Sequence, residues 1–252
     1  VYLQETSVHV TTEGPLTAVA AFDGAVFAGD AEGVLRLEGE QLIREKAIPG
    51  GVTRLKTLGE ALYAASPEGL WEYDGSAWAR LAEAPVADMC LHLGGIVVAS
   101  GNGVYRVEGD GLAPLVEDLR EPVEGVASYS GAVYFRHPKR LGLIDRGEAV
   151  YEIADWGAMR HGITTRDMLS VGSRLVVATD EGLAVLRGMT WYAVTGAEGL
   201  PYEDTTTLAE GFDGDLWIGT MRGAVRNAGD AYAYYGYGRW LPHDKVNGVA
   251  YD

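Results

Sequence analysis

One short pattern recurs six times along this chain: an apolar strand, a tight turn, and a second strand that begins with glycine. The glycines that open the second strand are Gly33, Gly69, Gly103, Gly142, Gly182 and Gly223, so consecutive copies are 36, 34, 39, 40 and 41 residues apart. A repeat of this length that contains only strands and turns is typical of a β-propeller, in which each copy forms one blade of a ring.

Each copy also contains a small, apolar strand before the hairpin, such as Val126-Ala127-Ser128, and a more polar strand after it, such as Gln41-Leu42-Ile43-Arg44. Small side chains suit the crowded strands nearest a propeller axis. Turns such as Asp23-Gly24 and Asp213-Gly214 have the composition that a tight hairpin with positive φ requires. Each copy therefore predicts a four-stranded sheet.

Seven inner strands can be counted, near residues 16–21, 52–58, 86–92, 123–128, 167–171, 205–210 and 246–251. We therefore expect an all-β, seven-bladed β-propeller that is closed by strand exchange between the two chain ends, since closure removes open sheet edges. In an alternative register, residues 1–13 supply only two outer strands and the seventh blade lacks one strand. The expected blades span residues 16–51, 52–85, 86–122, 123–166, 167–204, 205–245, and 246–252 together with 1–15.

Composition excludes several classes of function. The formal net charge is −16, which argues against a nucleic-acid partner because phosphate binding needs clustered Lys and Arg. No apolar run is long enough to span a membrane, and no signal peptide is visible at Val1. The single cysteine, Cys90, lies between Met89 and Leu91 and is expected to be a buried apolar residue.

The sixth copy carries the most specific motifs. It contains Gly199-Leu200-Pro201, then Thr207-Leu208, then Leu216-Trp217-Ile218-Gly219-Thr220. These segments resemble the two-component-regulator propeller repeat of the periplasmic sensor domains of bacterial hybrid histidine kinases. The resemblance implies a sensor-type propeller and a periplasmic or extracellular location. The following segment, Arg239-Trp240-Leu241-Pro242, is similar to bacterial propeller proteins related to ulvan lyases, in which most of the catalytic residues follow this turn.

In propellers of this type, the loops that enter the inner strands and the turns before the Gly-led strands share one face around the central funnel. Aromatic rings beside mixed charges on that face are typical of a site for a sugar or a uronate, because a ring packs on a sugar face and Arg binds a carboxylate. The candidate ligand-binding residues are His137, Lys139, Arg140, Arg166, Asp167, Tyr202, Glu203, Asp204, Arg222, Trp240, His243, Asp244 and Lys245.

The favoured function is therefore a non-catalytic propeller that binds a carbohydrate or a related small ligand. Two alternatives stay open. The first is a scaffold that binds a protein partner. The second is a polysaccharide lyase acting on a uronate-containing polymer, with His161 or His243 as the base and Arg160 or Arg166 beside the carboxylate. His9 and His92 lie in strand patterns and are expected to pack internally.

No metal site or cofactor is predicted. The sequence contains no pair of His or Cys residues at zinc-binding spacing. Asp213-Gly214-Asp215 resembles the beginning of a calcium loop but lacks the later ligands. We therefore interpret it as a turn between two strands.

Overall fold

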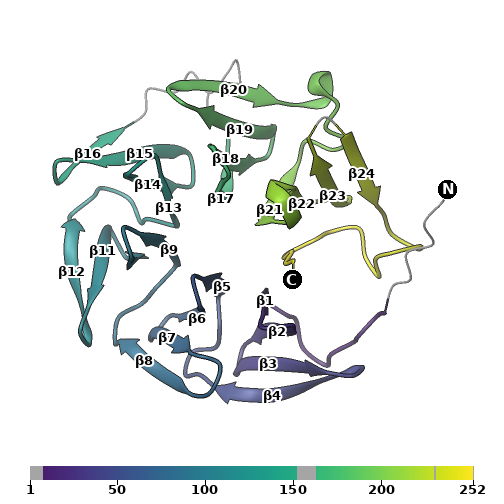
Figure 1. The fold of residues 1–252 in the computed structure, drawn as a ribbon, viewed down its shortest axis with the longest axis horizontal. Helices are drawn as coiled ribbons and strands as arrows, with labels where there is room; N and C mark the ends of the chain where they lie inside the picture. The colour runs from purple at the N-terminus through teal and green to yellow at the C-terminus, as the bar shows by residue number, and fades with distance from the viewer. Residues whose placement is uncertain (1–7, 152–162, 230, 252) are drawn as a thin grey trace.

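The chain folds into six four-stranded antiparallel sheets arranged in a ring around a central axis (Figure 1). This computed structural model describes residues 8–151, 163–229 and 231–251. In every sheet the four strands lie in chain order, from the axis to the rim. The all-β propeller predicted from the repeat is confirmed.

The first three sheets consist of β1 (Ala18–Phe22), β2 (Ala25–Asp30), β3 (Gly33–Glu38) and β4 (Gln41–Ala47); β5 (Arg54–Leu58), β6 (Ala61–Ser66), β7 (Gly69–Tyr73) and β8 (Trp78–Ala82); and β9 (Asp88–His92), β10 (Gly95–Ser100), β11 (Gly103–Glu108) and β12 (Gly111–Val116). The other three consist of β13 (Gly125–Tyr129), β14 (Ala132–His137), β15 (Arg140–Asp145) and β16 (Glu148–Tyr151); β17 (Thr165–Val171), β18 (Arg174–Thr179), β19 (Gly182–Arg187) and β20 (Thr190–Val194); and β21 (Thr205–Glu210), β22 (Leu216–Thr220), β23 (Gly223–Ala228) and β24 (Ala231–Tyr235).

Glycine is required at the start of the third strand because the backbone there approaches its neighbour closely. Gly33 has a φ of 142°, and a Cβ atom at this position would lie 2.1 Å from the carbonyl oxygen of Lys46. Gly223 repeats the arrangement, with a φ of 138° and 2.6 Å to the carbonyl oxygen of Tyr235. In five sheets the third strand begins with such a glycine. In the fourth sheet Arg140 begins the third strand, and Gly142 lies two residues later, where a Cβ atom would be 2.4 Å from the Phe135 ring.

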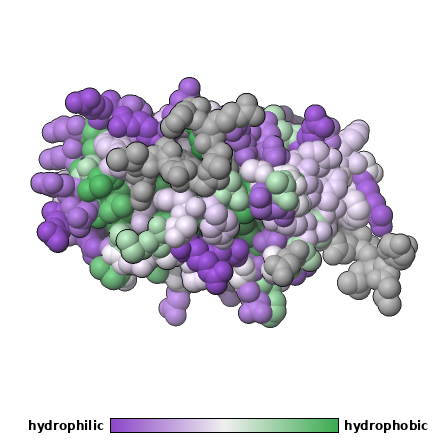
Figure 2. All heavy atoms as spheres, turned by 90° about the horizontal axis from the view of Figure 1, so that it is seen from above, coloured by the Kyte–Doolittle hydropathy of each residue, from purple (hydrophilic) through white to green (hydrophobic). Residues whose placement is uncertain are grey.

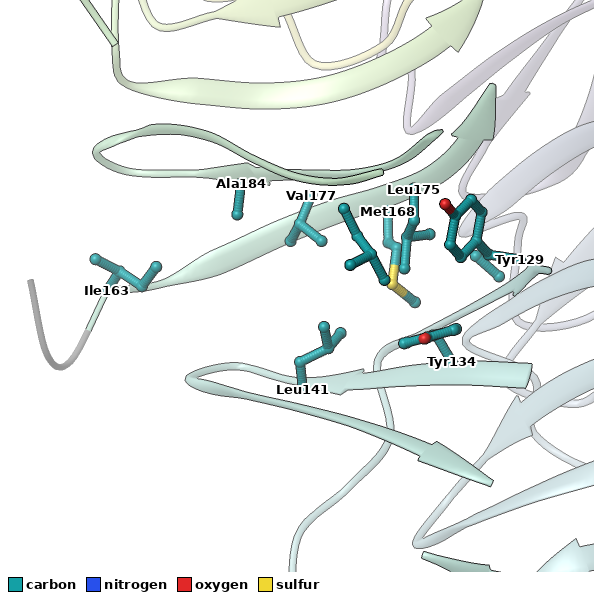
Figure 3. Packing of buried hydrophobic residues seen from close by; sticks show 10 residues of the cluster. Tyr129, Tyr134, Leu141, Ile163, Met168, Leu175, Val177 and Ala184 are labelled. Carbon is teal, nitrogen blue, oxygen red and sulfur yellow. The ribbon is translucent and has the colours of Figure 1, made fainter. Parts of the chain in front are cut away.

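Apolar side chains between neighbouring sheets form the core. Between β13–β16 and β17–β20, Met168 and Leu175 pack against Tyr134 and Leu141, and each of these residues is buried (Figure 3). Equivalent clusters fill the other four spaces between consecutive sheets. Cys90 belongs to one of these clusters and is 8% exposed, so its predicted burial is confirmed. Burial raises the pKa of its thiol to about 12.

The predicted seventh blade is wrong, because the structure contains six sheets. In the described part of the chain, neither residues 8–15 nor residues 246–251 form a strand. The last segment does begin where an inner strand would. The amide of Val246 donates to the carbonyl of Thr220 (3.0 Å), just as the amide of Val86 donates to Ser66 (3.0 Å).

The physical reason lies in the radial positions of the two chain ends. Residues 246–251 lie near the axis, whereas residues 11–15 lie at the rim beside β4, from where the chain runs inward to β1 (Figure 1). An inner and an outer strand need two strands between them to form one sheet, and no strand of the described chain lies there. We call the space between sheets β21–β24 and β1–β4 the wedge; it contains residues 8–17 and 236–251.

Seen edge-on, the rim of the ring mixes hydrophilic and hydrophobic residues (Figure 2). Within the described ranges, the structure contains no helix of the length and apolarity needed to cross a membrane. The two helical segments it does contain are single 3-10 turns, Gly196–Glu198 and Phe212–Gly214. The second of these lies between β21 and β22, where Asp213-Gly214 was predicted to form a turn.

Candidate functional site

One face of the ring contains the turns between second and third strands and the segments that enter the inner strands. We call it the loop face. The segments that enter the second to sixth sheets are fastened to the preceding sheet by backbone hydrogen bonds, for example from the Val52 amide to the Asp30 carbonyl (2.8 Å) and from the Val123 amide to the Gly101 carbonyl (2.9 Å). The loop face therefore presents its side chains from a rigid frame.

Four of the predicted ligand-binding residues meet on the loop face beside β17 and β21. The Arg166 guanidinium donates to the carboxylate of Asp204 and also to the carbonyl of Thr205 (3.0 Å). The Arg222 guanidinium lies 5.7 Å from the centroid of the Tyr202 ring, within the range of a cation–π contact. Tyr202 also packs against Tyr234, with 5.2 Å between ring centroids.

A cavity of about 390 Å³ opens next to this group of side chains. It is lined by Arg166, Thr206, Met221, Lys245 and Asn247. The amide of Met221 donates to the carbonyl of Asp204 (3.0 Å), which ties the β22–β23 turn to the segment that carries Tyr202. The cavity therefore has two cationic side chains in its walls and an aromatic pair beside it.

The other predicted site residues are dispersed. His137 is fully buried, with its Nδ1 2.7 Å from the Pro122 carbonyl and its Nε2 3.2 Å from the Tyr151 hydroxyl, so its ring does not reach the loop-face surface. Arg140 pairs with Glu121 (3.2 Å) and stacks 4.3 Å from the Tyr151 ring.

Glu203 accepts a hydrogen bond from the amide of Gly196 (2.7 Å), which orders the preceding 3-10 turn. Trp240 is partly buried against Tyr235, with 5.7 Å between ring centroids. Lys139, His243 and Asp244 are exposed. His9 is also exposed and lies outside any strand, so its predicted packing role is wrong; its Nε2 lies 3.2 Å from the carbonyl oxygen of Trp240. His92 is buried as predicted, with its Nδ1 2.9 Å from the Ser128 hydroxyl.

Two of the residues named in the lyase hypothesis, Arg160 and His161, lie outside the described residues. His243 is exposed two residues before Lys245, and Arg166 is held by Asp204. A catalytic role for any of these residues stays a prediction.

The sequence analysis missed a charged network near the axis. Arg54 lies on β5 and donates to two carboxylates from other sheets, Asp88 on β9 (3.1 Å) and Asp167 on β17. Lys56, also on β5, places its Nζ 2.7 Å from Oδ1 of Asp88. Both carboxylates also accept backbone amides, from Val126 (3.1 Å) and Leu208 (2.8 Å) respectively. The network therefore fastens the inner strands of five sheets to one another.

This network holds its charges despite burial. Desolvation alone would raise the pKa of Asp88, but the charges of Lys56 and Arg54 lower it to about 2. Burial likewise opposes the charge on Arg54, and the two carboxylates more than offset it, so the pKa of Arg54 is raised. Asp167, a predicted ligand-binding residue, is 3% exposed and has its oxygens occupied within this network.

A signal for the network was present in the sequence. Three inner strands carry a charged residue opposite the penultimate residue of the second strand, namely Arg54, Asp88 and Asp167. The other three inner strands have Ala18, Gly125 and Thr207 at this position. Among the described residues, no group of three or more His, Cys, Asp or Glu side chains is arranged to hold a metal ion.

No protein-family model and no curated protein sequence matches this chain. Solved structures do. An extracellular domain of a hybrid two-component system from B. thetaiotaomicron superposes with a TM-score of 0.71 at 12% identity, over 98% of this chain and 37% of that chain. A catalytically inactive virginiamycin B lyase from Staphylococcus aureus, solved with quinupristin, gives 0.71 at 11% identity, over 95% and 89% of the two chains. The WD40 propeller domain of Doa1 gives 0.67 at 14% identity, over 93% and 84%.

At these identities the likeness shows a shared propeller fold. A second structure of an extracellular domain of the same B. thetaiotaomicron protein, described there as a one-component system, also matches, with a TM-score of 0.64 at 13% identity. The matches therefore include an extracellular domain of a two-component system, the general class of propeller that the sixth repeat resembles. This chain spans 37% and 44% of those two longer chains. The relation of the Arg239–Pro242 segment to ulvan lyases stays a prediction.

Proposed function

We propose that this chain is a ligand-binding propeller without catalysis of its own, which recognises a carbohydrate or a related small ligand on the loop face. The observation that carries the proposal is the cavity of about 390 Å³ between β17, β21 and residues 245–247. Its size falls in the range of about 300–1,000 Å³ that small-molecule sites occupy.

The chemistry of the walls favours a ligand with an acidic group. Arg166 and Lys245 both line the cavity, and Lys245 is exposed. Asp204 holds the guanidinium of Arg166 in place and leaves further N–H donors for a ligand carboxylate. The Thr206 hydroxyl and the Asn247 amide add uncharged polar groups, which suit ligand hydroxyls. The Tyr202–Tyr234 pair lies outside the cavity lining, on a segment tied to the turn that carries Met221, and offers an apolar ring to a ligand that extends beyond the cavity.

A thermal-shift panel tests this proposal. Oligosaccharides with and without uronic acids would be titrated into the wild-type protein and into three variants, Arg166→Ala, Lys245→Ala and Tyr202→Ala. We expect a uronate oligosaccharide to raise the melting temperature of the wild type and each variant to lose most of that shift. Arg146→Ala is the matched control, because Arg146 is 92% exposed in a β15–β16 turn on the opposite face.

Two results would overturn the proposal. One is a panel in which no ligand moves the melting temperature, which would favour the scaffold alternative. The other is a ligand whose shift survives all three loop-face variants, which would place its site elsewhere.

A further inference from the structure

One apolar position of the second strand is covered in every sheet except the first, although Ala28 and Leu35 on the same face of that sheet are buried. The repeat places an apolar residue at the same register in each second strand: Val26, Leu62, Ile96, Val133, Leu175 and Leu216. The last five are between 0% and 9% exposed, because each packs against the preceding sheet of the ring. Val26 is 38% exposed.

Alternation along the strands shows where Val26 points. Ala18, Ala20 and Phe27 pack against sheet β5–β8. Val26 is paired with Ala21 and lies between residues of that packed row, so its side chain faces the opposite way, into the wedge. Leu35 and Leu42 share this face by register, and both line a cavity of about 500 Å³ in the outer part of the wedge.

The inner part of the wedge offers a backbone edge. Residues 246–251 begin at the place of an inner strand, and the backbone of Gly248 lies directly against Val19. In the described chain, the hydrogen bonds of this segment are made by Val246, to Thr220 and from Thr206. No ladder joins residues 247–251 to another strand. An added strand would find both free hydrogen-bonding groups and an apolar surface here.

The charges around the outer cavity specify the partner further. Four carboxylates line that cavity, from Glu13, Asp30, Glu32 and Glu40, against the single guanidinium of Arg44. Arg44 is already engaged by Asp30 (2.7 Å) and Glu32 (3.2 Å). The remaining negative charge favours a partner segment with Lys or Arg where it reaches the rim.

We infer that the wedge is a docking site for an extended segment of another polypeptide, which pairs with residues 247–251, covers Val26 with alternating apolar side chains, and carries basic residues toward the acidic rim. The five filled spaces between sheets show that strands with such side chains pack on this face. The inference does not rest on the ligand proposed for the loop face, although Asn247 belongs both to the segment that would be paired and to the wall of that cavity.

The probe is a fluorescein-labelled synthetic peptide with the sequence of residues 216–228, the chain's own β22–β23 strand pair. It has two arginines and no acidic residue, and its Trp217 occupies the register position that Phe27 holds against sheet β5–β8. Fluorescence anisotropy measures its binding to the full chain. We expect saturable binding that weakens as salt increases, and protection of the amides of residues 247–251 from hydrogen exchange.

Val26→Glu should weaken peptide binding about tenfold or more, because it places a charge under the apolar strand. Val150→Glu, at a valine that is 45% exposed on β16, is the matched control and should leave binding within about twofold. A peptide with both arginines replaced by Glu should bind more weakly than the original.

Three outcomes would overturn the inference. The first is no binding up to about 1 mM peptide, the weak limit of specific association. The second is binding that Val26→Glu leaves unchanged or that a scrambled peptide reproduces. The third is sedimentation of the chain as a dimer that Val26→Glu dissociates, which would make a second copy the occupant of the wedge.

Discussion

The two faces of sheet β1–β4 carry equally apolar residues but differ in what covers them. On one face, Phe27 is 1% exposed and packs in a cluster with Leu62 and Tyr73 of the next sheet. On the other face, Val26 is 38% exposed toward the wedge. The repeat therefore encodes a sheet that is apolar on both faces. On the wedge side Ala28 and Leu35 are buried without a neighbouring sheet, whereas the Val26 position is buried only in the sheets that have one.

This contrast predicts a large difference between two truncations at the same register. Leu62→Ala should lower the free energy of unfolding by about 3 kcal/mol, because it removes a fully buried side chain and leaves a cavity. Val26→Ala should lower it by less than about 1 kcal/mol, because its side chain is already in contact with water. Urea unfolding followed by tryptophan fluorescence measures both values.

Leu175→Ala serves as the control for the covered register, since Leu175 is 0% exposed in a different sheet. Leu175→Ala should lower the free energy of unfolding by about as much as Leu62→Ala does. If Val26→Ala proved as destabilising as these two variants, the wedge face would be covered in solution and the contrast would not hold.

The second to sixth sheets, which are in contact with one another around the ring, also share the charged network of Arg54, Asp88 and Asp167. This network makes the stability of the folded chain sensitive to acid. The charges of Lys56 and Arg54 hold the pKa of Asp88 at about 2 in the folded chain, below the value of about 3.9 that an aspartate has in an unfolded chain. A lowered folded-state pKa gives stability that is fully present above pH 4 and is lost as the pH falls toward 2. A lowering of this order corresponds to a loss of roughly 2 kcal/mol from this group.

Urea unfolding at a series of pH values between 7 and 2 tests this assignment in the wild type and in Asp88→Asn. The variant should be less stable at pH 7, because Arg54 and Lys56 lose a buried counter-charge. Its stability should fall less on acidification, by about 2 kcal/mol. Equal pH profiles for the two proteins would show that Asp88 does not carry the acid sensitivity.

The sequence analysis predicted the sheets well because their determinants are local. Gly33 approaches the Lys46 carbonyl within the β3–β4 pair. Asp23 and Gly24 have positive φ values of 50° and 69° in the β1–β2 turn. Each of these features is a requirement of one pair of neighbouring strands. The number of blades was wrong because residues 246–251 have the small, apolar composition of an inner strand. A strand also needs a partner beside it, and composition does not supply one.

The site was less predictable for the same reason. Arg166 and Asp204 were both selected from loop positions, but their pairing joins residues 38 positions apart. The bond from Arg54 to Asp167 spans 113 positions. His137 follows an apolar strand and looked accessible, yet the fold encloses it beside Tyr151. Burial and pairing of such residues depend on how sheets meet, which the repeat alone does not specify.

The smallest expected effect concerns the contact between the two chain ends. His9→Ala removes a hydrogen bond of 3.2 Å between an exposed ring and the Trp240 carbonyl. Water replaces such a bond readily, so the variant should lose less than about 0.5 kcal/mol, or about 1–2 °C in melting temperature.

His92→Ala is the comparison variant, from a sheet with a neighbour on both sides: His92 is 7% exposed, and its Nδ1 lies 2.9 Å from the Ser128 hydroxyl. It should cost about 1–3 kcal/mol, because it removes a buried ring and leaves the part-buried Ser128 hydroxyl without this partner. Differential scanning calorimetry of the two variants ranks them directly. If His9→Ala lowered the melting temperature as much as His92→Ala, the chain ends would be fastening the ring across the wedge, and the open face would be stabilised by that contact rather than left available to a partner.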